Sequence, residues 1–150
     1  MKKIFLAASL FFLFTSVKAQ ELSFEETVKY INDKMVDYGD GEPDYIASGQ
    51  FTAKANGDVK FGPYKFNLFV LNNNKKKEQD NQDEFGMELA HPSLDNGNTL
   101  IPGINFFSDG SGIARLSFKP NTPLIEIKRI HKAIIHLRSL CTKEKDPFDN

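Results

Sequence analysis

The fold is decided most clearly by TPLIEIKRIHKAIIHLRSLC, residues 122–141, near the C-terminal end of the sequence. Its apolar residues recur at helical spacing and form one stripe: Ile127, Ile130, Ile134, Leu137 and Cys141. This spacing is typical of an amphipathic helix that buries one face. Thr122 followed by Pro123 is typical of an N-cap and a first helical position. We therefore predict a helix from Leu124 to Cys141 that covers another element with its apolar stripe.

A second helix is predicted near the start of the chain. Ser23 and Glu26 have the spacing of a capping box, which satisfies backbone N–H groups at a helix start. The helix should begin at Phe24 and bury one apolar stripe: Phe24, Val28, Ile31 and Met35. The run Gly39 to Pro43 combines flexible glycines with a proline, so we expect the helix to end there.

Between the helices, the apolar spacing changes to the period of two that is typical of strands. This pattern runs from Tyr45 to Leu71, and Asn56-Gly57 within it predicts a tight hairpin in which both turn residues have positive φ. The return strand changes parity across Gly62-Pro63, which favours a bulge or bend. Apolar residues at both parities from Phe66 to Leu71 predict a strand covered on both sides.

Three further strands are expected after a polar loop from Asn72 to Asp83. They run from Glu84 to Ala90, from Thr99 to Phe107 and from Ile113 to Lys119. Pro102-Gly103 weakens the second strand, which we place at a sheet edge because proline donates no hydrogen bond to a ladder. Turn-forming residues separate the three strands, at 95–98 and 108–112.

These elements predict one α+β domain over residues 20–142, followed by a charged tail at 143–150. The expected order is an N-terminal amphipathic helix, a curled antiparallel sheet of about six strands, and a C-terminal amphipathic helix packed on that sheet. The final strand, the short proline-containing link and the closing helix resemble the end of a pleckstrin-homology-like barrel. The leading helix and a count of six rather than seven strands depart from that family. The resemblance implies a fold and no activity.

The first 19 residues have the layout of a secretory signal peptide. Lys2 and Lys3 precede an apolar run from Ile4 to Phe14, and cleavage is expected after Ala19. The run is too short to span a bilayer, which needs about 20 apolar residues. The sequence at 17–20 and the closing stretch of the last helix also resemble small uncharacterised exported proteins of Gram-negative bacteria. We expect an exported protein, periplasmic or secreted, with no membrane insertion of the mature chain.

The charge balance argues against nucleic acid as a partner. Of the 19 basic and 20 acidic side chains, the first 19 residues hold three basic and no acidic ones. The remainder therefore has 16 basic and 20 acidic side chains, a formal net charge of −4. A protein that follows phosphates needs a clustered basic excess.

Cys141 is the only cysteine in the sequence, so an intramolecular disulfide is impossible. An unpaired thiol in an exported protein indicates either a buried small apolar residue or a reactive group that forms intermolecular bonds. The position of Cys141 in the helical stripe favours the buried alternative.

The three histidines do not form a local metal site. His131 and His136 are five residues apart, which places them on different sides of a helix, and His136 should point away from the apolar stripe. His91 precedes a proline at the end of a predicted strand. No histidine is therefore assigned a catalytic or metal-binding role.

Two charged segments have compositions that could suit an ion or a charged ligand. Asp37, Asp40, Glu42 and Asp44 surround two glycines, but their spacing does not match a calcium-binding loop, so calcium binding by the turn Asp37 to Asp44 is left open. The basic run Lys75 to Lys77 is followed closely by acidic residues and is interpreted as a solvated loop.

The sequence contains no nucleophile elbow, phosphate loop or dinucleotide fingerprint, so no catalytic, cofactor-binding or metal-binding residue is assigned. We predict a non-catalytic exported module that binds an unidentified protein, peptide or small ligand. The alternatives are a cell-envelope hydrolase with dispersed carboxylates and a purely structural envelope protein. A deep pocket with two carboxylates, or a carboxylate and a histidine, would favour the hydrolase, whereas a shallow pocket lined by Phe and Leu would favour ligand binding.

Overall fold

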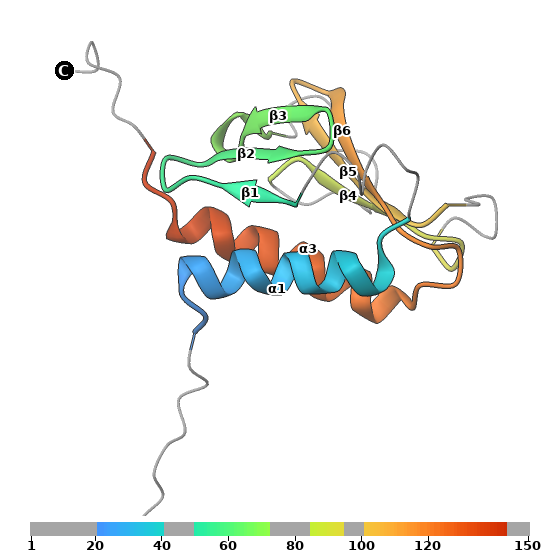
Figure 1. Ribbon diagram of the computed structural model, residues 1–150. Helices are drawn as coiled ribbons and strands as arrows, with labels where there is room; N and C mark the ends of the chain where they lie inside the picture. The colour runs from blue at the N-terminus through green and yellow to red at the C-terminus, as the bar shows by residue number, and fades with distance from the viewer. Residues whose placement is uncertain (1–20, 41–49, 73–84, 95–100, 144–150) are drawn as a thin grey trace, which may run out of the picture.

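The computed structural model describes residues 21–40, 50–72, 85–94 and 101–143. These residues form two α-helices, six β-strands and one 3₁₀-helix (Figure 1). In chain order they are α1 (Phe24–Tyr38), β1 (Thr52–Ala53), β2 (Asp58–Phe61), β3 (Tyr64–Asn67), η1 (Leu68–Val70), β4 (Met87–Ala90), β5 (Gly103–Ser108), β6 (Ser111–Ser117) and α3 (Leu124–Leu140). The α+β class is therefore confirmed.

The strands form two separate antiparallel sheets, ordered β1-β2-β3 and β4-β5-β6. The single curled sheet expected from the sequence was wrong, and no closed barrel forms among the residues that the structure describes. The first sheet ends with β3, and η1 follows this strand directly. Asn67 favours this change from strand to 3₁₀-helix, since its Oδ1 accepts a hydrogen bond from the Phe69 N–H at 2.9 Å and caps the 3₁₀ turn. The strand expected to reach Leu71 therefore ends at Asn67.

Gly62-Pro63 reverses the chain instead of bending one strand. Phe61 pairs directly with Tyr64, so Gly62 and Pro63 form the two-residue turn of a tight hairpin between β2 and β3. Gly62 has a φ of +50°, which a glycine adopts without steric cost. The parity change in the sequence is thus the signature of a two-residue turn, and not of a bulge or bend.

The hairpin predicted at Asn56-Gly57 is confirmed, because β1 pairs antiparallel with β2. Its turn differs from the prediction, since Gly57 has a φ of +90° and Asn56 does not have a positive φ. The Gly57 N–H donates to the Lys54 carbonyl at 2.9 Å, and the Lys54 N–H donates to the Asp58 carbonyl at 2.8 Å. The loop therefore holds three residues with the glycine last, a common alternative to the two-residue turn.

β5 lies in the centre of its sheet and not at the edge that Pro102-Gly103 suggested. Pro102 precedes the strand, so its missing N–H removes no ladder hydrogen bond. Gly103 pairs with Ala90 on one side and Ser117 on the other. A Cβ at Gly103 would lie 2.8 Å from the Leu116 carbonyl oxygen, so the close approach of the strands explains the glycine.

Both helices occur where the sequence predicts them. The capping box of α1 is confirmed, since Ser23 and Glu26 exchange side-chain-to-backbone hydrogen bonds of 3.3 and 2.8 Å. α3 begins at Leu124, but its N-cap is Pro123 and no side chain caps it. Thr122 is instead buried, and its hydroxyl lies 3.5 Å from the carbonyl oxygen of Tyr38 at the end of α1.

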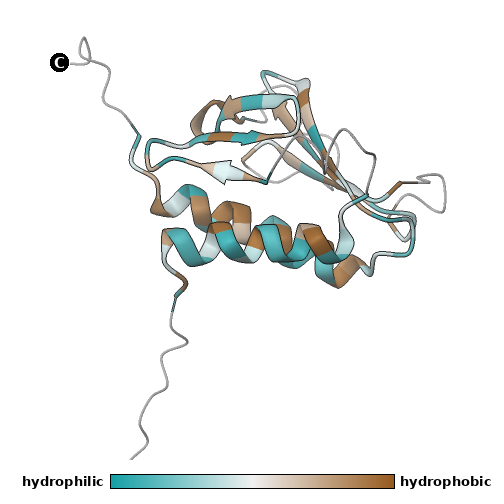
Figure 2. Cartoon of the chain, in the orientation of Figure 1, coloured by the Kyte–Doolittle hydropathy of each residue, from teal (hydrophilic) through white to brown (hydrophobic). Residues whose placement is uncertain are grey.

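The helices lie side by side below the sheets and run in opposite directions (Figure 1). Hydrophilic and hydrophobic residues alternate around both of them (Figure 2). Their apolar faces and the inner faces of the sheets share one core, whose largest fully buried side chains are Phe106, Phe118, Ile31, Leu68, Leu71, Met87, Ile104, Leu116, Ile127, Ile130, Ile134 and Leu137. No helix in the described ranges is both long and apolar enough to cross a membrane.

A buried carboxylate links the two helices. Glu126 on α3 is only 7% exposed, and its Oε2 accepts a hydrogen bond of 2.7 Å from Nζ of Lys34 on α1. Arg129 donates to the other carboxylate oxygen. The hydrogen bond from Lys34 is the main cause that holds the pKa of Glu126 below its usual value of 4.5, against the opposing effect of burial. The same bond raises the pKa of Lys34.

We expect Glu126→Gln to lower the melting temperature at pH 7, because the amide leaves Lys34 and Arg129 without a charged partner. A lowered folded-state pKa adds stability above the unfolded pKa of about 4.5, and this stability disappears as the pH falls through the folded value. The difference in melting temperature between wild type and variant should therefore be largest at pH 7 and decrease towards pH 3. Thermal melts at both pH values would measure it.

Asp33→Asn is the control, because Asp33 forms an exposed ion pair with Lys29 on α1. Exposed pairs of this spacing contribute little, so this variant should melt close to wild type at both pH values. A Glu126→Gln difference that does not change between pH 7 and pH 3 would contradict the assigned role of the carboxylate.

Candidate functional site

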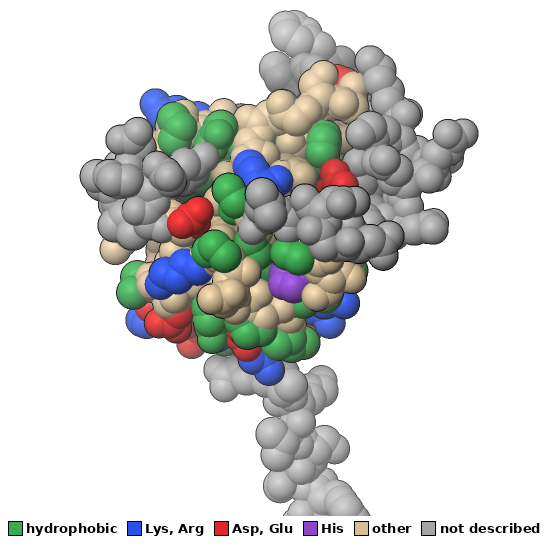
Figure 3. All heavy atoms as spheres, turned by 90° about the vertical axis from the view of Figure 1, so that its right-hand side faces the viewer, with side chains coloured by type: hydrophobic (Ala, Val, Ile, Leu, Met, Phe, Trp, Pro, Cys, Tyr) green, Lys and Arg blue, Asp and Glu red, His purple; other side chains and the backbone are tan. Residues whose placement is uncertain are grey.

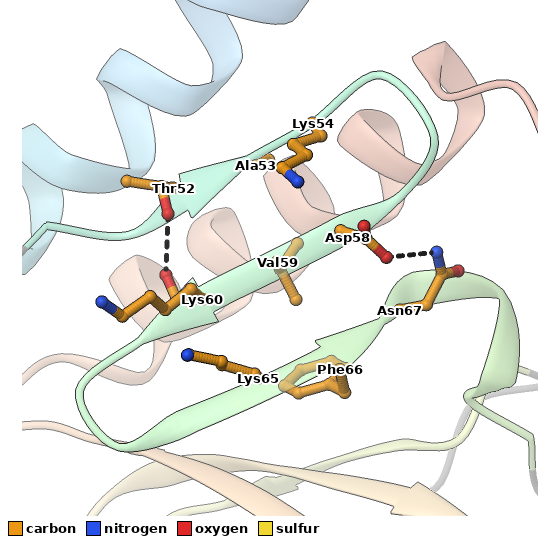
Figure 4. Close-up of a pocket in the computed structure, with 9 residues that line it drawn as sticks. All are labelled: Thr52, Ala53, Lys54, Asp58, Val59, Lys60, Lys65, Phe66 and Asn67. Carbon is orange, nitrogen blue, oxygen red and sulfur yellow. Dashed lines mark hydrogen bonds between the residues drawn. The ribbon is translucent and has the colours of Figure 1, made fainter.

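The described residues contain an open groove of about 580 Å³ on the outer face of the sheet β1-β2-β3. Two rows of polar side chains cross this face from strand to strand, and the register sets both rows. One row holds Thr52, Lys60 and Lys65, which are direct cross-strand partners. The second row holds Lys54, Asp58 and Asn67, in which Asp58 pairs with Asn67 and hydrogen-bonds through its backbone to Lys54. Figure 4 shows these six residues with Ala53, Val59 and Phe66, which complete the lining.

The inner face of the same sheet fixes its position. Phe51 stacks on Phe61 with ring centroids 6.0 Å apart, and Phe66 contacts Phe106 of β5 at 5.3 Å. Val59 and Phe61 are 4% and 5% exposed. Because alternate residues of a strand point to opposite faces, burial of this aromatic face leaves the lysine-bearing face towards solvent. The groove therefore lies on a well-anchored sheet.

Three lysines lie on this face, and all three are exposed: Lys54, Lys60 and Lys65. None of them forms an ion pair within 4.0 Å with a carboxylate in the parts of the chain that the structure describes. Within the described part of the chain, their amino groups are therefore accessible to a ligand from solvent.

Asp58 is the carboxylate of the groove, and two asparagine amides hold it. Nδ2 of Asn67 donates to one carboxylate oxygen at 2.9 Å, and Nδ2 of Asn56 donates to the other at 3.1 Å. These hydrogen bonds, that of Asn67 first, keep the pKa of Asp58 below its usual value, and the charge of Lys54 adds to the effect. Asp58 is therefore ionised at neutral pH and is suited to accept hydrogen bonds, and not to donate a proton.

A second hollow of about 440 Å³ adjoins the groove at this end and shares Asp58 and Asn67 with it. Its other lining residues are Asn56, Phe69, Val70 and Lys143. Asn67 Nδ2 also donates to the Asn56 carbonyl at 2.9 Å, so the same asparagine joins the β1–β2 turn to the start of η1. Hydrogen bonds therefore hold the side chains of Asn56, Asp58 and Asn67 in place at the polar end of the groove.

None of the three histidines lines the groove. His91 accepts the Ser93 N–H at Nδ1, and its Nε2 lies 3.1 Å from the Thr122 carbonyl, so Nε2 carries the proton. His136 is half-buried and not fully solvated, with Nε2 at 2.7 Å from the Leu22 carbonyl. His131 is also half-buried. The described residues contain no group of three or more side chains that could hold a metal ion.

Several predicted features fall wholly or partly outside the described residues. These are the signal peptide at 1–19, the acidic residues Glu42 and Asp44, the basic run Lys75 to Lys77, and tail residues 144–150. Asp37 and Asp40 are described, but Glu42 and Asp44 of the same turn are not, so the question of calcium binding by this turn lies outside the described residues.

Cys141 lies at the C-cap of α3, one residue beyond the last helical residue, Leu140. It is half-buried and packs against the core, and its Sγ lies 3.2 Å from the Leu137 carbonyl. Burial raises the pKa of this thiol. The position in the apolar stripe is therefore confirmed in part, because the end of the helix leaves the residue partly accessible.

Figure 3 shows the described side chains at one end of the molecule. Apolar side chains are mixed there with Lys, Arg, Asp and Glu. Among the described residues, the most exposed large apolar side chain is Val36, at 80%, followed by Ile125 at 55%. Scattered apolar residues are normal on a soluble surface and do not indicate a site.

Sequence reasoning did not single out the groove residues. The sequence feature that could have identified them is the parity change across Gly62-Pro63. A chain reversal there places Asp58 and Lys60 on the same face as Lys65 and Asn67. No protein-family model, curated protein or solved structure matches the chain. The functional argument therefore rests on the chain's own residues.

Proposed function

We propose that this chain is a non-catalytic exported binding module that takes its ligand in the groove over β1, β2 and β3. The observation that carries the proposal is the pair of cross-strand rows, which place three lysines, a carboxylate and an asparagine on one open face. Donors and acceptors that a sheet already holds in position lose little conformational freedom on binding, which favours affinity. The export of the protein rests on the signal-like layout of residues 1–19.

The composition of the groove favours binding over hydrolysis. Among its lining residues, Asp58 is the single carboxylate, and no histidine is present. General acid–base hydrolysis by dispersed carboxylates needs a second titratable group within reach of the bond that breaks. A cell-envelope hydrolase and a purely structural protein are the alternatives that the following experiment separates.

We expect ligands from a mixed-charge library of small metabolites to shift the backbone amide NMR signals of residues 52–67 in the purified chain. Thr52→Tyr should weaken this binding by about tenfold, because the ring fills part of the groove from an exposed strand position. Tyrosine suits a strand, so the variant should remain folded. Ser139→Tyr is the matched control, since Ser139 is exposed on α3 and does not line the groove.

Ligand-induced shifts that cluster elsewhere, or equal affinities for both tyrosine variants and wild type, would contradict the proposed groove. Conversion of a library compound during the titration would favour the hydrolase. A library without any bound compound would favour the structural protein.

A further inference from the structure

We propose that Lys60 and Lys65 together bind the oxyanion group of a small ligand, such as a phosphate, sulfate or carboxylate. This inference rests on the proposed function and names the chemistry of its ligand. It starts from the register, which places Lys60 of β2 directly opposite Lys65 of β3. Residues paired in this way have Cβ atoms about 5 Å apart, so the two amino groups can reach one anion between them.

Two like charges in this arrangement repel each other. Directly opposed like charges destabilise an antiparallel pair, and a nearby carboxylate would offset this repulsion. The residues that the structure describes supply no carboxylate within 4.0 Å of either lysine. An oxyanion bridging the two amino groups would offset this repulsion, so the free protein is already arranged to favour anion binding.

The two ends of the groove differ in charge, so a bound ligand would have a preferred orientation. Lys54 lies close enough to Asp58 for its charge to act on that carboxylate. The ionised Asp58 thus carries negative charge at this end, whereas no carboxylate of the described residues lies within 4.0 Å of Lys60 or Lys65. In Figure 4 the amino ends of Lys60 and Lys65 lie towards one end of the groove, and Asp58 and Asn67 lie towards the other.

A ligand that fits this pattern has an oxyanion at one end and hydrogen-bond donors, such as hydroxyl groups, at the other. The oxyanion meets Lys60 and Lys65, while the donors meet the Asp58 carboxylate. Lysine acts as a point charge and not as a planar fork, so the pair selects negative charge more than a particular anion shape. The binding should therefore weaken as salt is added.

The test is a titration of the purified chain with inorganic phosphate at constant ionic strength, with sodium chloride as the reference salt. We expect phosphate, and not chloride, to shift the amide signals of β2 and β3. Lys60→Gln/Lys65→Gln should weaken phosphate binding by about tenfold or more. The same double variant removes a like-charge pair, so it should melt at or above the wild-type temperature, and lost binding would not reflect unfolding.

Lys128→Gln/Lys132→Gln is the matched control. Both lysines are exposed on α3 and are four residues apart, so they also form a neighbouring like-charge pair and their loss changes the net charge equally. This variant should bind phosphate within about twofold of wild type. Equal losses in the two double variants, or equal shifts with chloride and phosphate, would overturn the inference.

Parallel titrations with sulfate, acetate and a sugar phosphate identify the source of the oxyanion. Binding of any of them that depends on Lys60 and Lys65 supports the inference, and tighter binding of the sugar phosphate than of phosphate supports the donor end at Asp58. If neutral library compounds bind the groove while no oxyanion does, this inference fails and the proposed function stands. If Thr52→Tyr leaves the binding of every library compound unchanged, the proposed function itself fails.

Discussion

Ile134→Asp is expected to unfold the domain at room temperature. Ile134 is fully buried in the core under the sheets, where an aspartate carboxylate would have no partner prepared for it. Such a substitution costs several kcal/mol, both for the desolvated charge and for the lost apolar contacts. This cost is comparable to the whole stability of a small domain, which is about 5–15 kcal/mol. Far-UV circular dichroism and a urea titration would measure the loss.

Ile125→Asp is a control of the same chemical change on the same helix. Ile125 is 55% exposed in the first turn of α3, where a negative charge interacts favourably with the helix N-terminus. We expect its free energy of unfolding to stay within about 1 kcal/mol of the wild-type value. Similar urea midpoints for the two aspartate variants would show that α3 does not bury the face assigned to it.

Gly86→Ala is expected to destabilise the domain by about 3 kcal/mol, from backbone strain and a steric clash. Gly86 has a φ of +73°, and a Cβ there would lie 2.7 Å from the backbone N of Asn72. Neither partner can move freely, because the Gly86 carbonyl accepts the Phe107 N–H at 2.8 Å and the Asn72 N–H donates to the Phe107 carbonyl at 3.2 Å. The alanine would therefore disturb the contact that joins the end of η1 to the second sheet.

Gly112→Ala tests whether the effect belongs to the site and not to the loss of a glycine. A Cβ at Gly112 would meet only the Phe107 ring at 3.7 Å, an ordinary contact, and its φ is not positive. The variant should stay within about 1 kcal/mol of wild type, since replacing a glycine also lowers the entropy of the unfolded chain. Equal guanidinium midpoints for the two alanine variants would contradict the tight packing around Gly86.

Both helices were predictable because their signals are local. The capping box at Ser23 and the apolar stripe through Ile127 and Leu137 depend on residues within one or two turns of each other. The exact N-cap of α3 was not predictable, because the Thr122 hydroxyl lies near the carbonyl oxygen of Tyr38, which is far away in the sequence. Local patterns therefore located the helices but not the contacts at their ends.

The sheets were predictable only as a set of strands. The turns at Asn56-Gly57 and Asp109-Gly110 were recognisable because glycine supplies a positive φ, and Asp109 also has one, at 49°. The chain reversal at Gly62-Pro63 and the central place of β5 depend on pairing with strands elsewhere in the chain. Residue type alone did not distinguish these outcomes from a bend and an edge strand.

By itself, the sequence determined the α+β class, the two amphipathic helices and the apolar faces that meet in the core, because each follows from periodicity and short-range backbone chemistry. Only the tertiary structure decided that the six described strands divide into two sheets, and that Lys60 faces Lys65 across one of them. The candidate site is one of the features that only the tertiary structure decided. Cross-strand register aligns residues through hydrogen bonds between separate strands, and a shift of one residue would turn every lysine of the groove towards the core.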